Sequence, residues 1–166
     1  KFLAEKLLLE IAEKNNLNYV ISRFAPVYSK ELMKDIYKRI YIKYPKIGFV
    51  VGKGLKYQFV SIYNIIDFVI KWIKSEKKLK GIINFRDVES IDSKKIIDLE
   101  RKMGKAKNVI YIPEFLVKFI DFMLSTIYKI TKSNMIFKLN INIKKIISPP
   151  NYSCNKIKEF FLPYWS

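Results

Sequence analysis

Segments with helical periodicity alternate with short apolar runs along this chain, and this alternation limits the fold more than any other feature. The helical segments are 1–15, 30–44, 64–78, 90–104, a long one that opens at Pro113, and a short one at 153–161. The strand-like runs between them are 18–24, 47–54, 56–62, 81–85 and 108–112. Helices that alternate with short strands are typical of an α/β fold rather than a helical bundle.

Several helix ends carry recognisable signals. Asn64 is a suitable N-cap for the third helix, and Asp92 or Ser93 is one for the fourth. Gly104 follows the fourth helix, where glycine is favoured, and Pro113 stands at a helix start, where proline is tolerated. We expect the first helix to cover one face of a sheet with an apolar stripe, namely Leu3, Leu7, Leu8 and Ile11.

Cysteine and histidine usage excludes several classes of site. The 166 residues include one Cys and no His. An internal disulfide and a cysteine-based zinc site are therefore excluded, as is any mechanism that uses an imidazole base. We expect no metal. The most apolar stretch, 115–130, is shorter than the roughly 20 residues that span a bilayer.

The formal net charge of +17 would suit nucleic acid or an anionic membrane. However, the lysines are spread over the whole chain, and Lys, Ile, Asn, Tyr and Phe are all abundant, as AT-rich codons favour. We therefore interpret the charge as solvated lysines and expect no nucleic-acid partner.

No glycine-rich turn joins a strand to a helix in these residues. The close glycine pair, Gly52 and Gly54, lies in a short turn between two strand-like runs. A dinucleotide-binding fingerprint needs strand, G-x-G-x-x-G and helix in that order, so none is present in this sequence.

Four motifs, in order and at matching distances, resemble the NAD-dependent epimerase/dehydratase family of the extended short-chain dehydrogenases/reductases. That family has Y-x-x-x-K-x-x-A-E on a helix, then R-P-x-x-V-Y-G after a strand, then a G-D-G turn and a further strand. The matching residues here are Lys1, Ala4, Glu5, Arg23, Val27, Tyr28, Gly52, Gly54, Phe59 and Val60. The segment SCNKIKEFFLPYW, 153–165, resembles the family's closing segment.

The resemblance implies the C-terminal part of a Rossmann-like NAD(P)-binding fold plus a small, mainly helical substrate-binding lobe. Residues 1–29 and about 64–85 would end the truncated Rossmann-like domain, and about 30–63 and 86–166 would form the lobe. Strands 18–24 and 81–85 would join the sheet, and the lobe would close over the turn at 24–28. The motif tyrosine and the cofactor half would lie upstream, so the chain alone is expected to be inactive and not to bind a dinucleotide.

The resemblance also implies a site. Lys1 would be catalytic, because a lysine beside the upstream tyrosine favours the phenolate, and it would hold the cofactor ribose. The cofactor, NAD or NADP, would also lie against Phe24, Ala25, Pro26 and Val27. The expected chemistry is hydride transfer at a sugar carbon of a nucleotide sugar, by an epimerase, dehydratase or reductase.

Tyr28, Lys56 and Tyr57 would bind the substrate. Tyr57 departs from the family, which often has an arginine there to bind the diphosphate, and a phenol cannot bind phosphate in that bidentate way. Ser29 likewise replaces a glycine. Lysines such as Lys53 and Lys56 offer charge instead.

A second hypothesis remains open. The chain would be a non-catalytic relative that docks on a membrane surface or a partner through its basic surface and the helix 113–132. A homodimer is compatible with either reading, and we expect a cytoplasmic location. A tyrosine four positions before Lys1 would favour catalysis.

Overall fold

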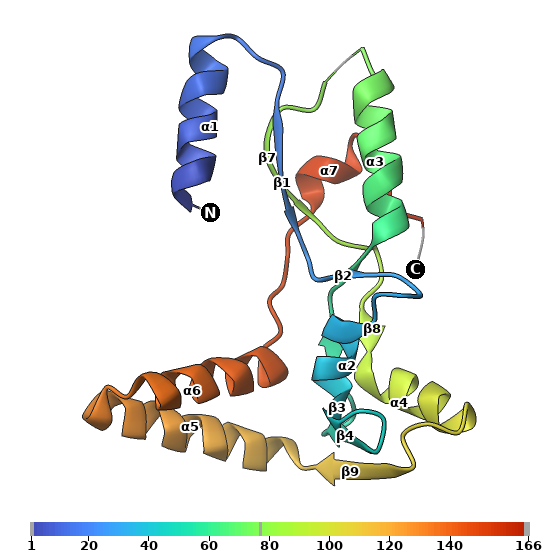
Figure 1. Ribbon diagram of the computed structural model, residues 1–166, viewed down its shortest axis with the longest axis vertical. Coiled ribbons are helices and arrows are strands. Elements are labelled where there is room, and N and C mark those ends of the chain that lie inside the picture. The colour runs from blue at the N-terminus through green and yellow to red at the C-terminus, as the bar shows by residue number, and fades with distance from the viewer. Residues whose placement is uncertain (1, 77, 165–166) are drawn as a thin grey trace. The chain divides into compact units, whose positions relative to one another are not determined.

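The computed structural model describes residues 2–76 and 78–164, and Lys1 lies outside this range. The fold is α/β, with short parallel strand pairs that alternate with helices along the chain (Figure 1). The chain forms two compact units. Unit 1 comprises the described residues of Lys1–Ser29, Phe59–Val88 and Tyr152–Ser166, and unit 2 comprises Lys30–Gln58 and Glu89–Asn151.

Unit 1 is built on two short parallel strand pairs. Its elements are α1 (Phe2–Lys14), β1 (Val20–Phe24), β2 (Val27–Tyr28), β6 (Val60–Ser61), α3 (Ile62–Lys74), β7 (Gly81–Phe85) and α7 (Asn155–Lys158). Strand β1 pairs with β7, from Val20 opposite Gly81 to Phe24 opposite Phe85, and β2 pairs with β6. The core lies around Phe68 and Phe85 and includes Phe161 from the closing segment. The strands expected at 18–24 and 81–85 are therefore confirmed.

The expected packing of the first helix is wrong. Leu3, Leu7, Leu8 and Ile11 are all exposed, whereas Ala12 is buried. The physical reason is the width of the sheet: β1 and β7 form a sheet of two strands within the described residues, which offers little apolar surface for a helix to cover.

The cap of α3 also differs from the expectation. Ser61, not Asn64, precedes the helix, and its Oγ accepts a hydrogen bond from the Tyr63 N–H at 3.3 Å. Asn64 lies fully buried in the first turn instead. A hydroxyl and an amide are both good caps, so the sequence alone did not separate them.

Unit 2 combines a three-stranded sheet with a pair of helices. Its elements are α2 (Lys34–Ile40), β3 (Tyr41–Lys43), β4 (Ile47–Val51), β5 (Lys56–Tyr57), β8 (Ile91–Asp92), α4 (Ser93–Lys102), β9 (Asn108–Ile112), α5 (Glu114–Thr131) and α6 (Asn134–Ile147). The sheet order is β3-β4-β9, with β4 parallel to β9, and β5 pairs separately with β8. Helices α5 and α6 lie side by side (Figure 1).

One helix boundary in unit 2 was predicted wrongly and two features were confirmed. The helix expected at 30–44 ends at Ile40, because Tyr41 pairs with Gly48 as a strand. The helix expected at 113–132 matches α5, which ends at Thr131 because Lys132 adopts a left-handed conformation with φ 53°. Of the two expected caps of α4, Asp92 and Ser93, it is Asp92 that caps the helix, and its Oδ1 accepts from the Lys94 N–H at 2.8 Å.

The closing segment lies in a different unit from the one expected. From Tyr152 onward it packs in unit 1, whereas the sequence placed 86–166 in the lobe. The roles of the units as cofactor-binding and substrate-binding parts stay a prediction. Among residues 2–76 and 78–164, no helix has the length and apolarity needed to cross a bilayer.

Candidate functional site

The turn at 24–28 lies at the carboxyl ends of the parallel strands β1 and β7. The Ala25 N–H donates to the Phe85 carbonyl at 2.9 Å, and the Pro26 carbonyl accepts from the Val60 N–H at 3.0 Å. These bonds fix the backbone of the turn. Ala25 is buried, while the Phe24 ring is 40% exposed and lies 5.9 Å from the ring centroid of Phe85. An apolar surface at the strand ends is where ligands bind in open α/β sheets.

A buried carboxylate that the sequence analysis missed lies behind this turn. The Asp87 side chain accepts hydrogen bonds from the Ser61 N–H at 3.0 Å, from the Asn64 Nδ2 at 2.6 Å and from the Tyr28 hydroxyl at 2.9 Å. Asp87 thus ties β2, the start of α3 and the end of β7 together. The available signal was its position two residues after a strand, at the ligand-binding edge of the sheet.

The electrostatics of this network follow from its burial. Burial raises the pKa of Asp87 above its ordinary value, and the hydrogen bonds from Ser61, Asn64 and Tyr28 oppose that shift only in part. Burial likewise raises the pKa of Tyr28, and the adjacent Asp87 adds to the effect. The Tyr28 phenol is therefore held protonated, as the donor to Asp87, and its chemical role is to position the turn.

Of the other residues that the resemblance implied, Lys1 lies outside the described residues, and Lys56 and Tyr57 belong to unit 2. Lys56 is exposed, and Tyr57 is 2% exposed. The Tyr57 hydroxyl donates to the Ile146 carbonyl at 3.2 Å, and burial raises the pKa of Tyr57 to about 12. Tyr57 therefore anchors the end of α6 to β5.

Replacing Tyr57 by phenylalanine is expected to lower the free energy of unfolding by about 1 kcal/mol, because one partly buried hydrogen bond is lost while the ring packing stays. Urea unfolding measures this change. Phenylalanine at the exposed Tyr111 is the matched control and should change stability by less than about 0.5 kcal/mol. An unchanged stability for Tyr57→Phe would show that the bond to Ile146 does not hold α6.

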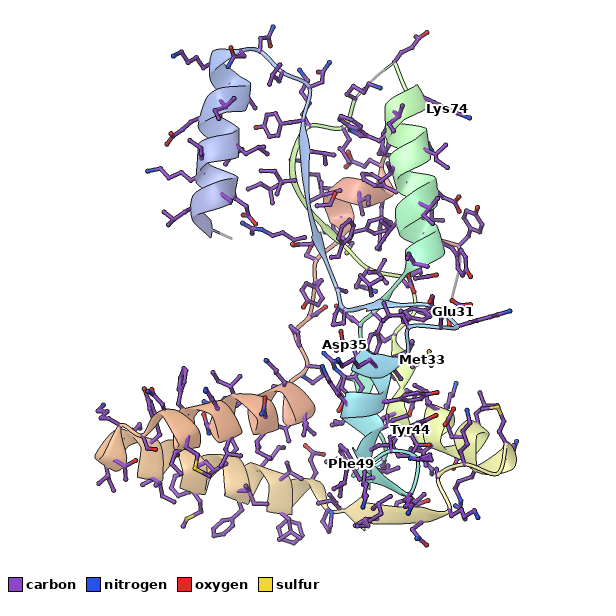
Figure 2. The ribbon with its side chains drawn as sticks, viewed as in Figure 1. Glu31, Met33, Asp35, Tyr44, Phe49 and Lys74 are labelled. Atoms are coloured by element: carbon purple, nitrogen blue, oxygen red, sulfur yellow. The ribbon has the colours of Figure 1, made fainter. Side chains whose placement is uncertain are left out.

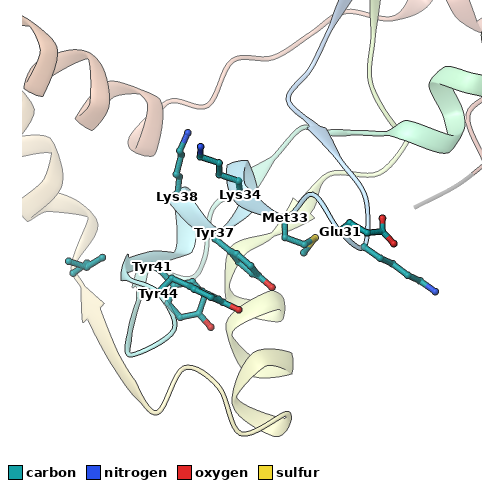
Figure 3. A pocket seen from close by; sticks show the side chains of 9 residues that line it. Glu31, Met33, Lys34, Tyr37, Lys38, Tyr41 and Tyr44 are labelled. Atoms are coloured by element: carbon teal, nitrogen blue, oxygen red, sulfur yellow. The ribbon is translucent and has the colours of Figure 1, made fainter.

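A cavity in unit 2 is lined by aromatic rings and lysines (Figure 3). It encloses about 630 Å³ beside α2 and β3. The rings of Tyr37 and Tyr44 stack with centroids 4.3 Å apart, and burial is the main factor that raises the pKa of Tyr37 to about 12. Figure 3 shows Lys34 and Lys38 extending from the other flank of α2. The stacked rings suit a flat ligand, and the ammonium groups on the opposite flank of α2 suit phosphate groups.

The tyrosines of this cavity were missed as a group. The sequence predicted a helix over 30–44 that includes Tyr44, whereas the chain leaves the helix at Tyr41 and turns back toward α2. The Tyr41 hydroxyl donates to Glu100 Oε2 at 2.9 Å, which holds this segment against α4. Among residues 2–76 and 78–164, no group of three or more His, Cys, Asp or Glu side chains is arranged to hold a metal ion.

Comparison with known proteins gives partial likenesses. No protein-family model matches the chain, and no curated protein matches it. Among solved structures, it resembles UDP-glucuronic acid 4-epimerase from Bacillus cereus in complex with NAD, at 23% identity and a TM-score of 0.47, over 64% of this chain and 38% of that one. It also resembles UDP-N-acetylglucosamine 4-epimerase from Bacillus cereus, at 19% identity and a TM-score of 0.48, over 68% of this chain and 41% of that one.

A third likeness is to leucoanthocyanidin reductase from Vitis vinifera in its complex with NADPH, at 16% identity and a TM-score of 0.42. It covers 89% of this chain and 47% of that one. The chain therefore spans less than half the length of each of these structures. Likenesses of this size do not place the chain in a family.

Proposed function

We propose that this chain is the C-terminal part of an NAD(P)-dependent epimerase, dehydratase or reductase that acts on a nucleotide sugar. The observation that carries the proposal is the turn at 24–28, which follows β1 at the carboxyl end of a parallel pair and carries the R-x-x-x-V-Y motif. The motif order along the chain supports it. When bound, NAD or NADP would accept a hydride from the substrate and could return it.

The residues of the turn fit an apolar cofactor ring. Phe24 is partly exposed and Val27 is half-buried, while the backbone between them is fixed by hydrogen bonds to β6 and to the end of β7. These two side chains would form one wall against the nicotinamide and exclude water from it. Tyr28, held by Asp87, would keep that wall in position. Lys1 would lie beside the motif tyrosine, where its positive charge would lower the pKa of that tyrosine toward the working pH.

Substrate binding falls to unit 2 in this proposal. Because Tyr57 is buried and bonded to Ile146, the phosphate groups would have to be bound elsewhere. The cavity beside α2 offers Lys34 and Lys38 for the diphosphate and stacked tyrosine rings for a base or sugar. The substrate class therefore rests on the motifs and on the chemistry of this cavity.

The test is hydride transfer by the complete protein. Phe24→Ser is expected to lower kcat/KM with NAD(P) and a UDP-sugar about tenfold or more, because the ring's apolar contact with the nicotinamide is lost. Cofactor affinity from calorimetry should fall in parallel. The matched control is Tyr111→Ser, which removes an exposed aromatic ring from β9 in unit 2 and should leave both quantities unchanged. Wild-type kcat/KM in Phe24→Ser would overturn the assignment of the turn, and absence of cofactor binding by the complete protein would overturn the function.

A further inference from the structure

The pair of helices α5 and α6 has a polar seam. Asn140 of α6 is buried, and its Nδ2 donates to Asp121 Oδ1 at 3.0 Å and to Ser125 Oγ at 2.9 Å, both on α5. Nearby, the Tyr128 and Phe137 rings meet with centroids 5.1 Å apart. Hydrogen-bonded side chains thus occupy positions that apolar residues fill in an ordinary helical hairpin.

The outward surface of the same pair is strongly apolar. We call this surface the hairpin face, and define it by Phe115, Phe119, Phe122, Ile130 and Met135. The exposed fractions of these side chains run from 59% for Phe119 to 78% for Ile130. Four of them recur at helical spacing along α5, so they share one side of that helix. Figure 2 shows side chains projecting from α5 away from α6 as well as toward it.

The pair also buries apolar side chains, since Val117 belongs to the core of unit 2 and Ile143 and Ile146 pack against that core. The hairpin face nevertheless departs from the usual pattern of a water-exposed helix pair, which keeps its outward surface polar. Large aromatic and aliphatic side chains in such number and so close together mark a surface that contacts another apolar phase. Elsewhere on the pair, Ile120, Ile143 and Ile146 line a mostly apolar cavity of about 270 Å³, which none of the hairpin-face residues lines.

The charges around the hairpin face are almost all positive. Residues 114–147 contain six lysines, namely Lys118, Lys129, Lys132, Lys138, Lys144 and Lys145, against the acids Glu114 and Asp121. Glu114 forms an ion pair with Lys118 at 2.7 Å, and Asp121 bonds to Asn140 in the seam. The surface is therefore complementary to one that is both apolar and anionic.

We propose that the hairpin face docks on an anionic lipid bilayer, with α5 and α6 lying in the interface. Aromatic and aliphatic side chains would enter the boundary of the acyl chains, and the flanking lysines would contact the phosphate headgroups. A second copy of the chain is a poorer occupant, because two copies packed face to face would bring the same lysines of each against one another. The buried bonds of Asn140 hold the two helices together while their outer side is in lipid.

Vesicle flotation with the whole chain tests the proposal. The chain should float with vesicles of phosphatidylcholine mixed with phosphatidylglycerol. Its partition coefficient on pure phosphatidylcholine should be lower by about tenfold or more, because the lysines add attraction to anionic lipid. The double variant Phe119→Ser/Phe122→Ser should lower the partition coefficient about tenfold or more. Lys129→Gln/Lys138→Gln should weaken binding to the anionic vesicles and reduce its dependence on salt.

The matched control is Ile73→Ser/Met103→Ser, which removes two exposed apolar side chains outside the hairpin face and should leave flotation unchanged. Circular dichroism checks that every variant is folded. Two flotation results would overturn the proposal: a folded wild-type chain that does not float with anionic vesicles, or a control variant that loses as much flotation as Phe119→Ser/Phe122→Ser. A third result would also overturn it: a wild-type chain that is a dimer and does not bind vesicles, and that Phe119→Ser/Phe122→Ser converts to a monomer.

Discussion

Replacing Asp87 by alanine is expected to lower the free energy of unfolding by about 3 kcal/mol or more. The carboxylate accepts from the Ser61 N–H, the Asn64 amide and the Tyr28 hydroxyl, and all three would lose a buried partner at once. An unsatisfied buried donor costs about 1–3 kcal/mol, so the loss of three partners outweighs an ordinary hydrogen-bond deletion.

Urea unfolding followed by circular dichroism measures this change, with Glu89→Ala as the control because Glu89 is exposed two residues further along. The control should change stability by less than about 0.5 kcal/mol. Equal stabilities for the two variants would show that the Asp87 network does not hold the turn.

The pH dependence of the same residue follows from its pKa. Burial raises the pKa of Asp87 in the folded protein above the unfolded value near 3.8, so the folded state binds the proton more tightly. The stabilisation is therefore complete below the unfolded pKa and is lost as the pH rises through the folded pKa. Asp87→Asn has no such proton, so the stability of the wild-type protein relative to Asp87→Asn should be greater near pH 4 than at pH 7. The reverse order would contradict the raised pKa.

Gly54→Ala is expected to destabilise the protein by about 3 kcal/mol. Gly54 has φ +103°, and a Cβ built there would lie 2.7 Å from Asp92 Oδ1 and 2.9 Å from Lys94 Cβ. A left-handed conformation costs a residue with a Cβ about 1–2 kcal/mol. Displacing Asp92 would also remove the N-cap of α4, which is worth about 1 kcal/mol.

Gly104→Ala separates these two contributions. Gly104 also has a positive φ, +76°, but a Cβ there would meet nothing within 4 Å. Its variant should therefore show the backbone strain alone, about 1–2 kcal/mol. The difference between the two variants in thermal or urea unfolding measures the contact with the α4 cap, and no difference would mean that Asp92 moves aside without loss.

Local signals in the sequence were sufficient for much of the fold. Asp92 was one of two candidate caps, with Ser93, because a carboxylate or hydroxyl before a helical run bonds to the backbone within three residues. Gly104 and Pro113 mark helix ends in the same local way. The strands at 81–85 and 108–112 were recognised because they are short apolar runs bounded by polar residues. In each case the energetic cause lies inside the segment itself.

Features that depend on distant residues were not predictable. Tyr41 lies within the helix predicted over 30–44, but its pairing with β4 across the sheet outweighs the helical pattern. Asp87 carried no motif, because its partners come from β2 and from the start of α3. For the candidate site, the sequence predicted a turn after β1 and a ligand edge, while the carboxylate that fixes the turn emerged only from the three-dimensional arrangement.

The parallel strand pairs have a consequence for how this chain reaches its native state. Val20 pairs with Gly81, and Ile47 pairs with Asn108, so the partners in both pairs are about 60 residues apart in sequence. The entropy of closing such long loops must be lost before the strands gain their hydrogen bonds, which makes folding slow compared with a chain of local contacts. Until the strands pair, their edges and the apolar side chains around them are exposed, and exposed edges of this kind favour aggregation of incompletely folded chains.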